Sequence, residues 1–203
     1  MKRSELVRRL EAIEGFSSPR ADWEQVVTPS ECAADLVAAA TVRGDIAGRT
    51  VIDLGSGTGR LAFAAAFLGA SAVVGVDRDD RAIERARATA GSLHLPVRFV
   101  VAEVDAFSEP ADTVVMNPPF GAQRRDADVP FWTKAFELAG RAVYAFAPFE
   151  ARAYVAARAR EAGFRVVEIV PVRWELPRTF PHHRKERVRL PVDRWSMERR
   201  ENE

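Results

Sequence analysis

Apolar residues follow two patterns that alternate along the chain. Short, largely apolar runs are typical of strands, whereas apolar residues spaced three or four positions apart are typical of helices. The predicted strands cover residues 50–54, 72–76, 97–101, 113–116, 142–146, 164–172 and 187–193. The predicted helices cover residues 3–14, 30–41, 59–69, 79–90, 130–140 and 150–162. Strands and helices therefore alternate through most of the chain.

This alternation predicts an α/β fold with a mostly parallel sheet. Strands that are apolar along their length need cover on both faces, which the intervening helices provide through right-handed crossovers. No helix is predicted between the last two strands, so the final strand should return as an antiparallel hairpin partner. The chain shows no internal repeat or linker, and we expect residues 1–203 to form one domain.

Composition excludes several classes of protein. Hydrophobic residues make up 47% of the 203 positions and charged residues 29%, as in ordinary globular proteins. Thirty basic and 29 acidic residues leave a net charge of +1, which excludes a strongly basic nucleic-acid coat but allows a local basic patch. The single cysteine, Cys32, excludes a disulfide scaffold and suits a reducing compartment. No apolar run reaches the roughly 18 residues of a membrane span, and Met1–Glu5 leads into no signal peptide. We therefore expect a soluble, cytoplasmic protein.

A glycine-rich loop, Asp53-Leu54-Gly55-Ser56-Gly57-Thr58-Gly59, joins the first predicted strand to a helix. Glycine allows the backbone to turn sharply and to approach a ligand closely. A dinucleotide fingerprint would place its third glycine where Arg60 stands. The G-x-G-x-G spacing instead resembles the S-adenosylmethionine (AdoMet) loop of the seven-stranded methyltransferases. A generic tight turn is the alternative.

Acidic residues follow the next two strands. Asp77 ends the second strand, where a carboxylate can accept hydrogen bonds from two ribose hydroxyls. The alternative is a helix cap, a role that Asp79 can also fill. Glu103 and Val104 follow the third strand, where an adenine ring should lie, with Asp105 as a competitor for the same contact. A solvated turn is the alternative there.

The fourth strand ends in the tetrapeptide Asn117-Pro118-Pro119-Phe120, whose four residues are the catalytic candidates. Two prolines stiffen the loop and contribute no N–H, so its carbonyls stay free as acceptors. The side-chain oxygen of Asn117 and the carbonyl of Pro118 can converge on one planar amine and orient it for methyl transfer. Phe120 offers a face on which a base can stack. A purely structural turn is the alternative.

This tetrapeptide resembles the (D/N)-P-P-(Y/F) motif of methyltransferases that modify adenine, guanine 2-amines or glutamine amides. Two further segments are more specific: Glu24-Gln25-Val26-Val27-Thr28 and the run W-E-L-P-R-T-F-P-H-H-R-K that begins at Trp174. Over about residues 1–195, the chain resembles the archaeal and eukaryotic family that makes N6-methyladenosine in small-subunit ribosomal RNA. The resemblance implies a Rossmann-like, seven-stranded class I methyltransferase fold, with residues 1–48 as a helical cap that contributes to the cofactor site.

The resemblance also implies AdoMet as the cofactor and a set of contacts to it. The implied contacts are Gln25, Thr28, Gly55, Thr58, Arg60, Asp77, Glu103, Val104 and Asn117, and the rest of the glycine loop adds Asp53, Gly57 and Gly59. The chain departs from the family at Val26-Val27, where an aromatic residue and proline are usual. It also departs at Glu103, which is one methylene longer than the usual Asp.

Two partners are expected besides the cofactor. The basic run around His183, Arg184, Lys185 and Arg187 can hold RNA phosphates, although a solvated hairpin loop is the alternative. Its paired histidines have no further ligand at suitable spacing, so no metal site is predicted. The family uses a small zinc-binding activator protein on an edge of the sheet, and strand 97–101 is the expected edge.

Two alternative functions remain open from sequence. The same chemistry could act on DNA adenine, a guanine 2-amine or a protein glutamine, although 203 residues leave little room for a DNA target-recognition domain. The chain could also be a non-catalytic RNA-binding module. The presence of Asp77, the glycine loop and Asn117 favours an enzyme, since a dead copy has no reason to keep them.

Overall fold

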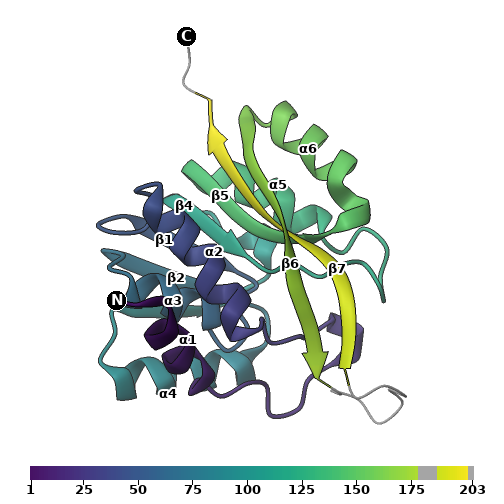
Figure 1. Ribbon diagram of the computed structural model, residues 1–203. Helices are drawn as coiled ribbons and strands as arrows, with labels where there is room; N and C mark the ends of the chain where they lie inside the picture. Colours follow the sequence, from purple (N-terminus) through teal and green to yellow (C-terminus); the bar gives the residue numbers. More distant parts are fainter. Residues whose placement is uncertain (178–186, 201–203) are drawn as a thin grey trace.

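The computed structural model describes residues 1–177 and 187–200 and contains one seven-stranded sheet (Figure 1). The strands are β1 (Thr50–Leu54), β2 (Ala72–Asp77), β3 (Val97–Val101), β4 (Ala111–Met116), β5 (Ala139–Pro148), β6 (Phe164–Pro177) and β7 (Arg187–Arg199). They lie in the order β3-β2-β1-β4-β5-β7-β6. Strands β1 to β5 pair in parallel, and β7 is antiparallel to both β5 and β6. The predicted sheet and its antiparallel last strand are confirmed.

The helices also occur where the sequence predicts them, with ends that differ by a few residues. They are α1 (Arg3–Glu11), α2 (Ser30–Val42), α3 (Arg60–Phe67), α4 (Asp80–Leu93), α5 (Val129–Leu138) and α6 (Arg152–Glu161). Short 3₁₀ turns, η1 (Ala21–Trp23), η2 (Val104–Ala106) and η3 (Phe149–Ala151), complete the elements. None of the helices in these described ranges is both long and apolar enough to cross a membrane.

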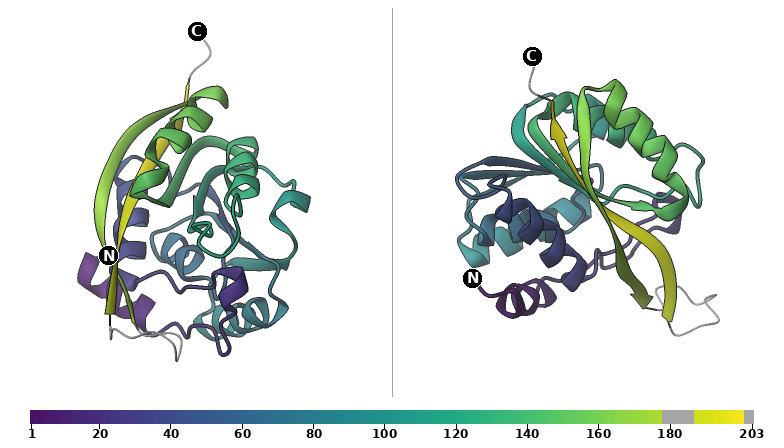
Figure 2. Two further views of the ribbon diagram at one scale, coloured as in Figure 1. Left: turned by 90° about the vertical axis from the view of Figure 1, so that its right-hand side faces the viewer. Right: turned by 45° about the horizontal axis from the view of Figure 1, so that its top comes forward.

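Two hydrophobic cores cover the two faces of the sheet. One core contains side chains from α1 to α4, with Leu10, Leu36, Phe63 and Ile83 among its buried members. The other contains side chains of α5 and α6, among them Trp132, and both layers are visible in Figure 2. The helices change face where β1 lies beside β4. In sheets of this kind, such a switch point opens a crevice at the carboxyl ends of the strands, where ligands bind.

Strands β6 and β7 are longer than predicted. Apolar patterning indicated residues 164–172 and 187–193, whereas the paired hairpin extends from Phe164–Arg199 at one end to Pro177–Arg187 at the other. The hairpin projects beyond the other strands (Figure 1). The extra residues place the buried Trp174, Trp195 and Met197 among charged side chains, so no continuous apolar run marks them in the sequence.

Candidate active site

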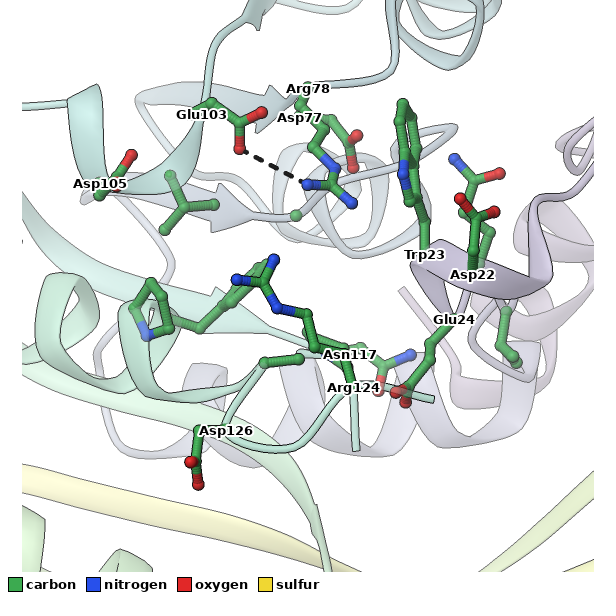
Figure 3. A pocket seen from close by; sticks show the side chains of 18 of the residues that line it. Asp22, Trp23, Glu24, Asp77, Arg78, Glu103, Asp105, Asn117, Arg124 and Asp126 are labelled. Carbon is green, nitrogen blue, oxygen red and sulfur yellow. Dashed lines mark ion pairs between the residues drawn. The ribbon is translucent and has the colours of Figure 1, made fainter. Parts of the chain in front are cut away.

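A cavity of about 290 Å³ opens at the carboxyl ends of β1 to β4 (Figure 3). Its lining combines the segment before α2, the strand ends and the loop that leads to α5. The lining residues include Trp23, Glu24, Gln25, Gly55, Asp77, Arg78, Glu103, Val104, Asn117 and Pro119. A smaller cavity of about 30 Å³ lies against the glycine loop and includes Thr28, Asp53, Gly57, Thr58 and Arg60 in its wall. The two cavities share Phe16, Val26, Gly55 and Asn117.

The glycine loop requires glycine for two reasons. Gly55 and Gly57 have φ angles of 71° and 51°, which L-amino acids with side chains rarely adopt. A Cβ atom on either would lie 2.6 Å from an aromatic carbon, of Phe131 for Gly55 and of Phe16 for Gly57. Gly59 lies in neither cavity wall, and its missing side chain leaves room for core phenylalanines instead. The loop thus brings bare backbone to the cavity at its first two glycines.

Asp53 lies almost fully buried at the end of β1. Its Oδ2 accepts a hydrogen bond of 2.9 Å from the Ala62 amide, whereas Oδ1 has no hydrogen-bond partner among the described residues. Burial raises the pKa of this carboxyl to about 7, and the nearby Asp77 adds to the effect. A buried oxygen without a partner is costly, and a bound water or a ligand can supply the missing donor.

Asp77 is held at the cavity wall by two backbone amides. Its Oδ2 accepts from Gly57 at 2.7 Å and its Oδ1 from Asp79 at 2.9 Å. Burial raises the pKa of the Asp77 carboxyl, and these two hydrogen bonds oppose the rise. Each carboxylate oxygen can accept more than one hydrogen bond, so both remain available to a ligand.

Arg78 crosses the cavity beside Asp77 (Figure 3), a placement that sequence reasoning did not identify. Its guanidinium pairs with Glu103 at 3.8 Å and stacks over the ring of Trp23 at 4.2 Å from the centroid. Arg20 stacks on the same ring at 3.6 Å. The side chain of Glu103, predicted to contact adenine, therefore shares the cavity rim with a cation, and Val104 lines the cavity beside it.

Two side chains of the tetrapeptide line the larger cavity, and the other two pack toward the core. Asn117 donates from Nδ2 to the Thr28 hydroxyl at 3.1 Å, and its buried Oδ1 has no partner among the described residues. Pro119 lines the larger cavity, whereas Pro118 is buried. The half-buried Phe120 packs against Trp174, with ring centroids 5.9 Å apart. Asn117 thus presents an acceptor oxygen in a wall that both cavities share.

Hydrogen bonds join segment 20–28 to the residues after β2, to the first residue of α3 and to the tetrapeptide. Gln25 accepts from the Arg20 amide at 2.8 Å and donates to Asp79 at 2.5 Å. Arg60 donates to the carbonyl of Thr28 at 3.0 Å, so its guanidinium anchors the segment. Glu24 accepts hydrogen bonds from the amide of Phe120, the last residue of the tetrapeptide, and from the amide of Gln123 in the loop that follows. Most of these contacts join residues far apart in sequence, and only the E-Q-x-x-T motif hinted at them.

Some predicted residues lie beyond the described part of the chain. The RNA candidates His183, Arg184 and Lys185 fall outside the described residues, and Arg187 begins β7. The expectation that strand 97–101 lies at a sheet edge is confirmed, because β3 is the first strand in the sheet order and, among the described strands, pairs with β2 alone.

Comparisons with known proteins find methyltransferases that are similar to this chain over most of its length. Residues 33–143 match the family model of the methyltransferase small domain. The rRNA N(6)-adenosine-methyltransferase Mettl5 of Drosophila melanogaster is 32% identical, over 98% of this chain and 97% of the relative. The rRNA N(6)-adenosine-methyltransferase METTL5 of Danio rerio is also 32% identical, over 95% of this chain and 97% of the relative. The crystal structure of PH1948 from Pyrococcus horikoshii is 35% identical, with a TM-score of 0.91 and 98% of both chains covered.

Proposed function

The chain belongs to the methyltransferase small domain family and, over nearly its whole length, to the rRNA N(6)-adenosine-methyltransferases. We infer from this membership that it methylates an adenosine of small-subunit ribosomal RNA. The observation that carries the proposal is Asn117. Its side-chain oxygen is buried at the end of β4, beside the glycine loop, and has no hydrogen-bond partner in the part of the chain that the structure describes. An acceptor in that position is what an incoming amine requires.

The cavity walls fit AdoMet in charge and in hydrogen bonding. Acidic side chains outnumber basic ones in the larger cavity: Asp22, Glu24, Asp77, Glu103, Asp105 and Asp126 against Arg78 and Arg124. Such a lining favours a ligand that carries positive charge. When bound, AdoMet supplies a methyl group attached to a positively charged sulfur. The unpartnered Oδ1 of Asp53 offers a site for a cationic donor.

We assign the cofactor contacts by the position of each group. Asp77 holds the ribose hydroxyls, and Glu103 and Val104 lie where the adenine ring binds. Asp53, Gly55, Gly57, Thr58 and the capping residues Gln25 and Thr28 surround the amino-acid end. Support comes from the cavities, since all of these residues line one or the other. Residues 1–48 then act as a cap on a domain that spans the chain.

The target amine is held by acceptors rather than activated by a strong base. Asn117 Oδ1 and the Pro118 carbonyl accept its two N–H groups and direct the nitrogen toward the methyl group. The amine becomes acidic only once methylated, and its proton then passes through these acceptors to water. Phe120, supported from behind by Trp174, offers its remaining exposed face to the adenine ring.

We propose two macromolecular contacts and a cytoplasmic location. The basic run of His183, Arg184, Lys185 and Arg187 binds RNA phosphates, a proposal that rests on sequence alone. A small zinc-binding activator protein covers β3. Two observations support this second contact: β3 lies at the edge of the described sheet, and the side chain of Val101 is exposed.

The variant Asn117→Ala tests the proposed role of the amide. We expect AdoMet affinity, measured by calorimetry, to change little, while methyl transfer falls by roughly 3–4 kcal/mol of transition-state stabilisation. Asn117→Asp keeps an acceptor oxygen and serves as the matched control, with activity between the two. Methylation at the wild-type rate by Asn117→Ala would remove Asn117 from the mechanism. A wild-type protein that does not bind AdoMet would instead be the non-catalytic RNA-binding module.

A further inference from the structure

We propose that Glu24 is a positioning residue that fixes the shape of the catalytic loop, residues 117–123, by accepting hydrogen bonds from two of its backbone amides. The inference rests on the adenosine methyltransferase activity proposed above and assigns it a further required residue. Glu24 lies in the cavity wall beside Asn117 (Figure 3). It belongs to segment 20–28 and not to the sheet that carries the tetrapeptide.

Both oxygens of the Glu24 carboxylate are used. Oε2 accepts from the Phe120 amide and Oε1 from the Gln123 amide, each at 2.8 Å. Between them Gly121 has a φ of 78°, a left-handed conformation that turns the loop so that the two amides face the same carboxylate. Hydrogen bonds from amides to a charged acceptor are among the stronger ones in proteins.

The two prolines explain why this attachment matters. Pro118 and Pro119 have no N–H, so the first amide after Asn117 that can be held is that of Phe120. Glu24 takes that amide, and Thr28 accepts from the Asn117 side chain on the other side. The same segment therefore holds the catalytic loop at both ends of the tetrapeptide.

The backbone conformation of Glu24 is unfavourable for glutamate, which indicates that this position needs the carboxylate side chain. Its φ and ψ angles of 53° and 35° are left-handed, which is uncommon for a residue other than glycine, asparagine or aspartate. Strained residues of this kind persist where the surroundings hold them, often at functional sites. Here the neighbours are anchored: Trp23 lies between Arg20 and Arg78, and Gln25 is bonded to Asp79.

Two substitutions separate the carboxylate from the backbone. Glu24→Gln keeps the size but offers one acceptor oxygen, so one of the two amides must lose its partner. Glu24→Gly removes the carboxylate and accommodates the left-handed backbone without strain, so the fold is retained. Glu161→Gln, on the exposed surface of α6, is the matched control.

The experiment measures amide hydrogen exchange of residues 120–124, kcat at saturating RNA and AdoMet, and the Kd of AdoMet. In both Glu24 variants we expect faster exchange at Phe120 and Gln123 and a kcat lowered by about 100-fold, because a misplaced catalytic group costs on that order. The Kd of AdoMet should change much less than kcat, and thermal unfolding should show that both variants remain folded, as the wild type and Glu161→Gln do.

The proposal is overturned if both variants keep the wild-type kcat, or if the exchange of the two amides does not change. A wild-type protein that leaves adenosine unmethylated would refute the proposed function instead. In that case the exchange measurement would still decide whether Glu24 holds the loop.

Discussion

Single residues at this site carry polar atoms that the fold itself does not satisfy. Asp53 Oδ1 and Asn117 Oδ1 are buried without partners among the described residues, a condition that costs folding free energy. Asp77, in contrast, is secured by two amides. The unsatisfied oxygens point to ligand groups, and the satisfied carboxylate provides a fixed position from which to bind one.

Asp77→Ala tests the cofactor assignment. Loss of the proposed charged hydrogen bonds to the ribose, each worth roughly 1.5–3 kcal/mol, should weaken AdoMet binding more than tenfold. Calorimetry provides the affinity, and thermal unfolding provides the control for lost amide contacts to Gly57 and Asp79. Asp77→Asn keeps the size and removes the charge, and its affinity should lie in between. Equal affinity in all three proteins would disprove the ribose contact.

Asp53 gives a prediction about pH. Its pKa is about 7 in the folded chain and about 3.9 in unfolded peptides, so between these values the unfolded state loses the proton first. The wild type should therefore lose stability relative to Asp53→Asn as pH rises through this window. The difference between the two proteins should change by up to about 4 kcal/mol between pH 4 and pH 7, since each pKa unit corresponds to about 1.36 kcal/mol.

Denaturant unfolding of the cofactor-free proteins at several pH values measures this difference. Comparison with Asp53→Asn cancels the titration of other groups, because only one carboxyl differs. A stability difference that stays constant between pH 4 and pH 8 would show that Asp53 does not titrate in this range.

At the scale of elements, patterning predicted the parallel core of the fold well. Strand β1 occurs at Thr50–Leu54 as predicted, because apolar residues buried on both faces leave a clear local signal. The hairpin of β6 and β7 was underestimated, because its extra residues place the buried Trp174, Trp195 and Met197 among charged side chains and form no continuous apolar run.

The candidate site was predictable where it belongs to a strand end. Asp77 and Asn117 follow apolar strands directly, and parallel strands bring their carboxyl ends together. The positions of Trp23, Glu24 and Arg78 depend on how segment 20–28 folds over the sheet. Their contacts span up to about a hundred residues of sequence, so no local pattern could reveal them.

The basic run that ends at Arg187, the first residue of β7, is the proposed RNA contact. Replacement of Arg184, Lys185 and Arg187 together by Ala should raise the KM for RNA and leave AdoMet affinity unchanged. Each lost phosphate contact should also reduce the salt dependence of binding by about 0.7 units of log–log slope. Filter binding at several salt concentrations measures both quantities. Unchanged affinity and slope would direct attention to the basic residues of α1, such as Arg8 and Arg9.

At the scale of the whole molecule, the distribution of charge bears on how RNA is bound, and the packing of the sheet bears on how the site is held. The net charge of +1 gives no general attraction for RNA, and the larger cavity is acidic. We therefore expect a local basic region to bind RNA, and we expect the target adenine to leave its stack on entering the site, at a cost of a few kcal/mol. Helices on both faces support the strand ends, so the site rests on rigid elements.

Methyl transfer from isotopically labelled AdoMet to small-subunit ribosomal RNA tests the central claim most directly. The RNA is digested to nucleosides after the reaction, and mass spectrometry identifies the labelled one. We predict label in N6-methyladenosine with the wild type and almost none with Asn117→Ala. Label in a guanosine, or none in RNA while DNA or a glutamine-containing protein is methylated, would contradict the assignment.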